Sequence, residues 1–350
     1  IALEIPDDLE IIPPEDQEYL AETKELVINE ISAWEEGEAI LSARFSAIGG
    51  EVSQTVKVVS LLSDGQESFV QTEEVKTINV LTPRLQTSSQ INNTAYAIAN
   101  FEDNIRFSAI VKNIGDVPLR DIAVTGNLSG EEVYWDQTTN SNLIALEPGQ
   151  QTILTVDRRV AANVRPQNYS MSWQTQATAQ IDDLDVTTYS QSSSSQVVFN
   201  SDLTFEADAE YYGNDGEQIG YGPYPLKAGE TTAIRVFWKV SNFSNNLSNV
   251  TIQSQLPSQV EWTNFTSVSE GSAITYDPST RKVTWHVSNL EANTHPQGAN
   301  FELRITPNFQ QVGQYINITH DSTLSALDSY TRQVLYRFQG PARLEKPVIE

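Results

Sequence analysis

Apolar and polar residues alternate along most of this chain with a period of two. The pattern is clearest over residues 107–111, 236–240 and 283–287, where every second side chain is apolar. Because successive side chains of a β-strand point to opposite faces of a sheet, this spacing predicts strands with one buried face. The inward phase includes Trp238 and Trp285, which we therefore expect in hydrophobic cores. Turn-forming Gly, Pro, Asn and Asp residues separate the runs.

An all-β fold is the prediction, with one open question near the start of the chain. Residues 15–30 have a helix-forming composition, but their apolar residues do not keep a regular helical spacing. A short helix and an irregular loop are both possible interpretations there.

Blocks of similar sequence recur along the chain. Residues 105–128 and 234–256 share an alternating strand, an asparagine (Asn113 or Asn242) followed by an apolar residue, a polar turn and a second strand. Further shared blocks begin at Leu143, Val287 and Ile31. Such repetition is typical of tandem copies of one structural unit.

A short boundary pattern, found at residues 80–85, 198–203 and 338–344, divides these blocks into units of sandwich-domain size. We expect complete β-sandwiches at residues 83–200 and 201–339. Residues 1–82 match only the back half of such a domain, and residues 340–350 resemble the opening strand of another.

Two segments of the third unit resemble a known family. The sequences GPYPLKAGETTAIRVFWKVSNFSNNLSNVTIQSQLP (222–257) and ITYDPSTRKVTWHVSNLEANT (274–294) are similar to the conserved-repeat domains of prokaryotic cell-surface proteins. The match covers residues 201–339 well, 83–200 moderately and 1–82 only in the second half. In the middle unit, Leu-Ser-Gly at 128–130 departs from the Leu-Pro or Ile-Pro of the others. The resemblance implies tandem Ig-like antiparallel β-sandwich domains in an extended array, with a structural, extracellular role and no catalytic residue.

Composition excludes several other functions. The 46 acidic and 21 basic residues give a net charge of −25, which argues against nucleic-acid binding. The excess is greatest in residues 1–80, where 18 acids and 4 bases give −14. The chain has no cysteine, and hence no disulfide or thiolate zinc site. No apolar run is long enough to span a membrane. The absence of a signal peptide and the start at Ile1 suggest a mature or proteolysed product.

Oxygen-rich turns and Asn-x-Ser/Thr sequons supply the candidate modification and metal sites. Calcium, the one possible cofactor, takes clustered oxygen ligands, and two acidic turns have the right residue types: Asp182, Asp183 and Asp185, and Asn214, Asp215 and Glu217. Solvated hairpin turns are the alternative. Candidate glycosylation sites are Asn242, Asn246, Asn249 and Asn264.

Two further segments are candidate contact surfaces. Tyr211, Tyr212, Tyr221 and Tyr224 lie in a Pro/Gly-rich region and are candidates for an exposed aromatic patch. The tail could complete the truncated first unit of a neighbouring copy by strand addition, giving a head-to-tail filament. The residues assigned to that assembly are Pro341, Leu344, Pro347, Val348 and Ile349. Alternatively, the sequence is simply part of a longer array.

The function predicted from these features is non-enzymatic: an extracellular spacer, or a subunit of a cell-surface filament or layer. Its partners would be copies of itself or other surface proteins. An adhesin-type module that recognises a glycan or host protein is the alternative, and an enzyme with accessory sandwiches is a third. With 46 acids, carboxylate pairs arise by chance, so none is assigned a catalytic role.

Overall fold

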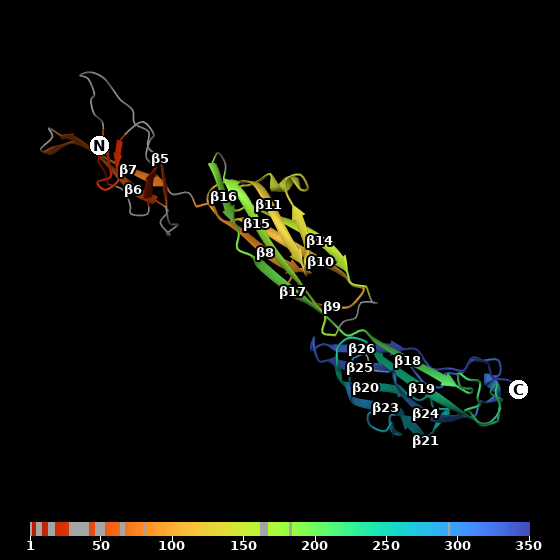
Figure 1. The fold of residues 1–350 in the computed structure, drawn as a ribbon. Helices are drawn as coiled ribbons and strands as arrows, with labels where there is room; N and C mark the ends of the chain where they lie inside the picture. The colour runs from red at the N-terminus through yellow and green to blue at the C-terminus, as the bar shows by residue number, and fades with distance from the viewer. Residues whose placement is uncertain are drawn as a thin grey trace.

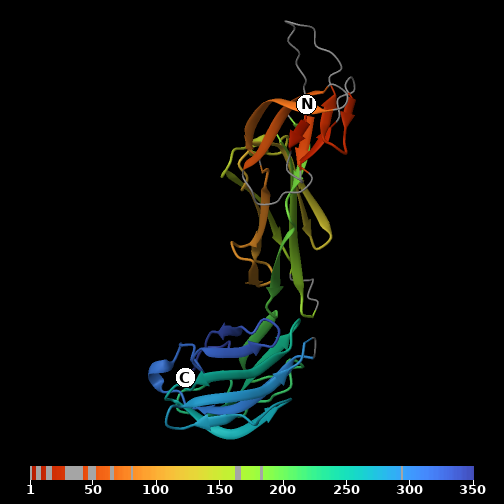
Figure 2. The same cartoon turned by 90° about the vertical axis from the view of Figure 1, so that its left-hand side faces the viewer.

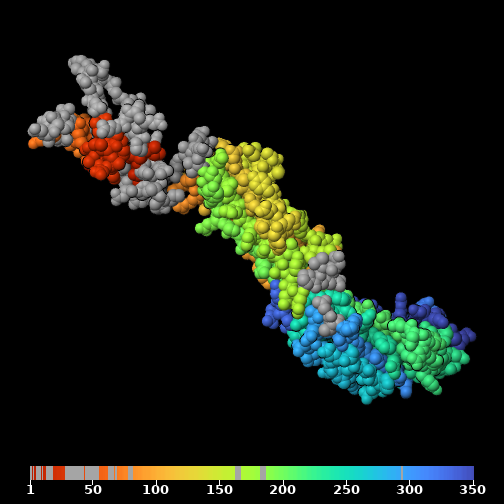
Figure 3. Space-filling model, in the orientation of Figure 1, coloured from red at the N-terminus to blue at the C-terminus, as the bar shows by residue number. Residues whose placement is uncertain are grey.

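The computed structural model describes residues 2–4, 9–12, 18–27, 42–45, 53–63, 67–79, 82–161, 167–181, 184–292 and 295–350. Three groups of β-strands follow one another along an elongated molecule (Figures 1 and 3). The described residues form strands, turns and two short 3₁₀ helices, η1 (Ser141–Leu143) and η2 (Phe309–Gln311), with no α-helix. The all-β prediction is therefore confirmed. In the part of the chain described, no helix is long and apolar enough to cross a membrane.

The first unit contains a five-stranded sheet in the order β3-β4-β1-β6-β7 and a two-stranded sheet of β2 and β5. The strands are β1 (Ala2–Glu4), β2 (Leu9–Ile12), β3 (Glu18–Leu20), β4 (Glu25–Val27), β5 (Ser42–Phe45), β6 (Ser53–Ser63) and β7 (Ser68–Asn79). Over residues 18–27, the described part of 15–30, β3 and β4 pair as a hairpin, so neither a helix nor an irregular loop forms there. Lys24 adopts a φ of 55° in its turn, and Leu26 is buried.

The middle unit is a sandwich of two sheets around one hydrophobic cluster. One sheet has the order β14-β10-β8; the other runs β12-β11-β15-β17-β9, with β13 on β11 and β16 on β15. The strands are β8 (Leu85–Ile91), β9 (Tyr96–Ala99), β10 (Asn104–Asn113), β11 (Leu119–Leu128), β12 (Glu131–Trp135), β13 (Ala145–Leu146), β14 (Gln151–Arg159), β15 (Ser170–Ile181), β16 (Leu184–Tyr189) and β17 (Ser193–Phe199). Trp173 is fully buried between the sheets, and its Nε1 donates to the Ser108 carbonyl at 2.9 Å.

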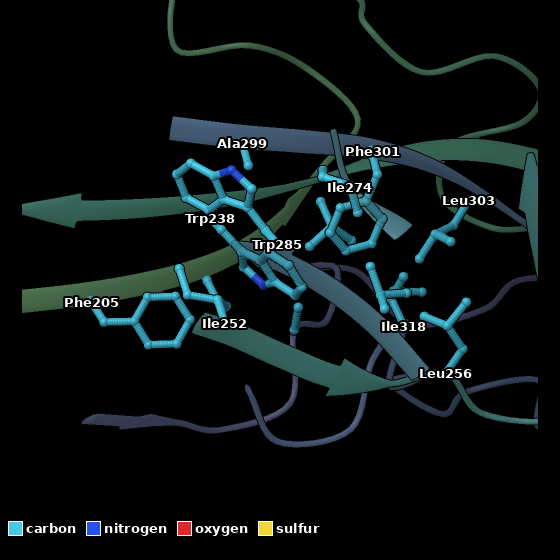
Figure 4. Packing of buried hydrophobic residues seen from close by; sticks show 14 of the residues in the cluster. Phe205, Trp238, Ile252, Leu256, Ile274, Trp285, Ala299, Phe301, Leu303 and Ile318 are labelled. Carbon is cyan, nitrogen blue, oxygen red and sulfur yellow. The ribbon is translucent and has the colours of Figure 1, made fainter. Parts of the chain in front are cut away.

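The third unit is a second sandwich, with sheets in the orders β18-β19-β24-β21 and β22-β23-β20-β25-β26. The strands are β18 (Leu203–Glu210), β19 (Thr232–Asn242), β20 (Leu247–Gln255), β21 (Val260–Val268), β22 (Thr275–Asp277), β23 (Lys282–Leu290), β24 (Gln297–Ile305), β25 (Ser322–Asp328) and β26 (Val334–Gln339). Trp238, Trp285 and Phe301 pack together between the sheets (Figure 4). Both tryptophans are thus core residues, as their strand phase predicts.

The tail belongs to the third sandwich, which corrects the prediction that it is free to join another copy. Ile349 N donates to the Leu226 carbonyl at 2.8 Å, and Val348 N donates to the Gln314 carbonyl at 3.0 Å. Leu344 and Val348 are buried members of the sandwich's own hydrophobic cluster. Since their backbone and side chains are already paired within this domain, donating 341–349 to a neighbour would require opening the core.

The predicted domain boundaries at 82/83 and 200/201 remain predictions. The two buried clusters run from Leu85 to Phe199 and from Leu203 to Val348.

Candidate functional site

The junction between the middle and third sandwiches is formed by buried polar side chains. The two sandwiches meet end to end where β17 leads into β18 (Figures 1 and 2). Asn245, in the turn after β19, is fully buried. Its Nδ2 donates to the Phe199 carbonyl of β17 at 2.8 Å, and its Oδ1 accepts from the Asn168 backbone nitrogen at 3.0 Å. One side chain of the third sandwich therefore binds two segments of the middle one.

Asp328, at the end of β25, anchors Asn245 and the segment that connects β17 to β18. Its carboxylate is fully buried. Oδ2 accepts from Ser201 N at 2.7 Å and from Asn245 Nδ2 at 2.9 Å. Oδ1 accepts from the backbone nitrogens of Tyr330 and Thr331 at 2.9 and 3.0 Å. A buried carboxylate is tolerated only with such a full set of donors.

A third link runs through Asn200. The Thr331 hydroxyl donates to Asn200 Oδ1 at 2.7 Å, while Asn200 Nδ2 donates to Asn100 Oδ1 of the middle sandwich at 3.0 Å. The junction thus has several hydrogen bonds in different directions, and bending between the domains would break them together.

A second feature is a hollow of about 730 Å³ on the outer face of the β18-β19-β24-β21 sheet. The floor of the hollow is formed by rows of residues that lie opposite one another on neighbouring strands. In one row, Asp208 lies opposite Phe237, which lies opposite Asn300. In the next row, Glu206 lies opposite Lys239, which lies opposite Gly298. Because Gly298 has no side chain, the second row is open at one end. The turn at residues 213–214, together with Ser269 and Pro296, lines the rim.

The hollow is rich in hydrogen-bond acceptors. Glu206 forms an ion pair with Lys239 at 3.3 Å. Burial, with a smaller contribution from the charge of Asp208, raises the pKa of the Glu210 carboxyl. Asn300 Oδ1 is buried and has no hydrogen-bond partner among the described residues. The lining therefore carries an excess of negative charge beside the Phe237 ring.

The residues predicted to bind calcium do not form a ligand cluster where the structure describes them. Asn214, Asp215 and Glu217 lie in an exposed hairpin turn, in which Asp215 Oδ1 accepts from the Glu217 backbone nitrogen at 3.1 Å. Asp182 and Asp183 lie outside the described residues, and Asp185 lies on β16. Within the described ranges, no three His, Asp or Glu side chains are grouped to hold a metal ion.

Three of the four predicted glycosylation sites are exposed: Asn246, Asn249 and Asn264. Asn242 is buried, and its Nδ2, the atom that would carry a glycan, donates to the carbonyls of Asn245 at 2.7 Å and Leu290 at 3.2 Å. This geometry argues against modification of Asn242 in the folded protein. Glycosylation at the other three stays a prediction.

The four tyrosines divide between core and surface. Tyr211 is buried and stacks on Tyr224 with ring centroids 4.7 Å apart. Burial is the main cause that raises the pKa of both hydroxyls. Tyr212 packs edge-on against both rings but is 48% exposed, and Tyr221 is 80% exposed. The expectation that all four form an exposed patch is therefore corrected for Tyr211, which packs in the interior of the domain.

Sequence reasoning did not find the junction or the hollow. The repeat alignment identified Asn113 and Asn242. The residues three positions later, Asp116 and Asn245, could have indicated the junction. The hollow depends on residues from four strands, which no local sequence pattern brings together.

No family model matches the chain, and no curated protein matches it. The resemblance to the conserved-repeat family therefore stays a prediction. Solved structures that are similar include the CARDB domain of a Pyrococcus furiosus protein in complex with di-metal ions, at 13% identity over 33% of this chain and 93% of that chain (TM-score 0.24).

Two other similar structures come from bacterial surface proteins. The C-terminal domain of the Streptococcus pyogenes antigen I/II-family protein AspA is 9% identical over 78% of this chain and all of that chain, with a TM-score of 0.28. BcpA, the major pilin subunit of Bacillus cereus, is 8% identical over 76% of this chain and 69% of that chain, with a TM-score of 0.31. These values assign neither a family nor a function to this chain.

Proposed function

We propose that this chain is a non-enzymatic structural segment of an extracellular or cell-surface protein, in which tandem sandwiches act as a spacer. The observation that carries the proposal is the buried polar junction centred on Asn245 and Asp328. A spacer must hold its domains at a fixed separation, and flexibly linked domains need no such network.

Hydrogen-bond energies support a stiff connection. Three neutral hydrogen bonds join the two sandwiches through Asn168, Asn200 and Asn245. At about 1 kcal/mol each, they favour the closed junction by about 3 kcal/mol. Since about 1.4 kcal/mol is a factor of ten, the open form would be populated at about 1%. The net charge of −25 would also keep such a rod soluble.

Association with copies of this chain or with other surface proteins would use a surface other than the tail, which is bound within its own domain. The adhesin alternative gains support from one feature, the acceptor-rich hollow on the third sandwich.

The spacer proposal is tested by measuring the distance between the two sandwiches in the full chain. Because the chain has no cysteine, Gln137→Cys and Ser258→Cys, both at exposed positions, give one spin-label pair across the junction. We expect a single narrow distance distribution by pulsed electron paramagnetic resonance. Asn245→Ala should broaden it, whereas the matched control Gln333→Ala, an exposed residue in the neighbouring loop, should not. A broad distribution in the chain without further substitution would refute a spacer role.

A further inference from the structure

We propose that the hollow on the β18-β19-β24-β21 face binds an arginine or lysine side chain presented by a basic segment of a partner protein. The proposal does not depend on the spacer role, because the hollow lies within one domain and away from the junction.

The first argument is charge. Glu206, Asp208 and Glu210 follow one another on the outer face of β18, and the hollow's cation, Lys239, pairs with Glu206. No ion pair is formed by Asp208 or Glu210 within the described part of the chain. Asp208 is exposed and Glu210 is half-buried. Two carboxylates beside each other repel, and a cation between them would relieve the repulsion. A ligand of opposite charge is therefore favoured.

The second argument is hydrogen bonding. Asn300 lies in the same row as Asp208, and its Oδ1 is a buried acceptor with no partner in the part of the chain that the structure describes. An unpaired buried acceptor is unfavourable. Together with the carboxylates, it calls for a ligand that supplies several N–H donors, as a guanidinium or ammonium group does.

The third argument is the aromatic ring between these groups. Phe237 lies between Asp208 and Asn300 in strand register. The same sheet already holds one cation in this way, since the Arg235 guanidinium lies 4.8 Å from the centre of the Phe265 ring. Such cation–π contacts are attractive, and more so where the pair is shielded from water. Inside the hollow, Phe237 offers a ring of the same kind beside the Asp208 carboxylate.

The volume of the hollow and the net charge of the chain indicate which molecule carries the cation. A hollow of about 730 Å³ exceeds one side chain, so flanking residues of an extended segment would also fit. A second copy of this chain, at net −25, is repelled by the same charges. A basic segment from a different protein is the occupant that these observations favour.

Binding is tested by isothermal titration of the full chain with a blocked pentapeptide, Gly-Arg-Gly-Arg-Gly. A peptide with citrulline in place of arginine keeps the shape and the amide donors but removes the charge. We expect the arginine peptide to bind, the citrulline peptide to bind at least tenfold more weakly, and 1 M salt to weaken binding.

Variants separate the hollow from general electrostatics. Asp208→Asn with Glu210→Gln should weaken binding at least tenfold, whereas Glu261→Gln, an exposed residue of β21 outside the hollow, should change it less than twofold. Gly298→Leu should block the hollow without strain, because an added Cβ meets only the Trp238 carbonyl at 3.7 Å.

The proposal is wrong if the arginine peptide does not bind, if the citrulline peptide binds equally, or if Gly298→Leu has no effect. Binding of chito-oligosaccharides, tested in parallel, would overturn it in favour of a glycan site if the arginine peptide fails.

Discussion

Replacing Asp328 by alanine should destabilise the third sandwich and loosen the junction in a single step. The carboxylate accepts four hydrogen bonds of 2.7 to 3.0 Å, two from its own loop and two from Ser201 and Asn245. Hydrogen bonds to a charged group contribute about 1.5–3 kcal/mol each, but burial of the carboxylate offsets part of this sum. The alanine variant leaves these buried N–H donors without an acceptor, at roughly 1–3 kcal/mol each, so after the offset we expect a net loss of about 3–5 kcal/mol.

Urea denaturation of the full chain, followed by tryptophan fluorescence, measures the loss. Asp321→Ala is the matched control, because Asp321 lies just before the same strand but is exposed. It should change the free energy of unfolding by less than about 0.5 kcal/mol. A double-mutant cycle with Asn245→Ala should give a coupling of about 0.5–3 kcal/mol, since the two side chains are hydrogen-bonded. A loss for Asp328→Ala no larger than that of the control would refute the network as a stabilising element.

Three further predictions concern separate parts of the chain. Gly126→Ala should destabilise the middle sandwich by about 1–3 kcal/mol in thermal or urea unfolding, because the added Cβ would overlap the Trp173 ring; Gly340→Ala, which meets open space, should be neutral. Asp277 should titrate by NMR with a pKa of about 2, held low mainly by hydrogen bonds from the Ser279 and Thr280 hydroxyls, and Ser279→Ala should raise that pKa. Since the pKa of Asp277 is lower in the folded state, its contribution to stability is present above pH 4 and is lost as the pH falls towards 2. Truncation after residue 340 should lower the free energy of unfolding of the third sandwich by roughly 3–6 kcal/mol. The estimate is the lost burial of Leu344 and Val348, at about 1.5–3 kcal/mol each. Unchanged unfolding would show that the tail is dispensable.

Much of the fold could be predicted from the sequence because strand periodicity is a local signal. The phase of residues 236–240 and 283–287 placed Trp238 and Trp285 inside, and both are buried. The helix-forming composition of 15–30 was misleading, because helix propensity is a weak preference that pairing between β3 and β4 overrides. The tail was misjudged for a related reason. Its similarity to an opening strand does not indicate which segment it pairs with, and in the structure it pairs with segments of its own domain.

The candidate sites were less predictable, because they depend on register across strands. The hollow requires Asp208, Phe237 and Asn300 to be opposite one another on β18, β19 and β24. These positions are far apart in sequence, so composition alone could not select them from the other acids and aromatics. The tyrosines illustrate the same difficulty: Tyr211 and Tyr212 are adjacent, yet one is core and the other is exposed.

The repeated asparagine, Asn113 or Asn242, forms the same hydrogen bonds in both sandwiches. Asn113 and Asn242 are both buried, and each donates its amide to a carbonyl of the following turn and to a second strand, at Leu146 or Leu290. In each sandwich, the backbone nitrogen of the next residue donates to a carbonyl just before the first strand, Ile114 to Arg84 and Phe243 to Asp202. The asparagine thus fixes the turn on the incoming connection.

The residue three positions after this asparagine differs between the two sandwiches. In the middle sandwich it is Asp116, which accepts from the Thr82 backbone nitrogen at 2.7 Å, on the connection from the first unit. In the third it is Asn245, whose amide both donates and accepts, and so reaches Phe199 and Asn168 of the preceding sandwich. A carboxylate accepts only, so Asp116 can bind donors of the connection but not a carbonyl of the unit before it. Asn245 therefore adds to its junction a link to the preceding sandwich of a kind that Asp116 is not able to form.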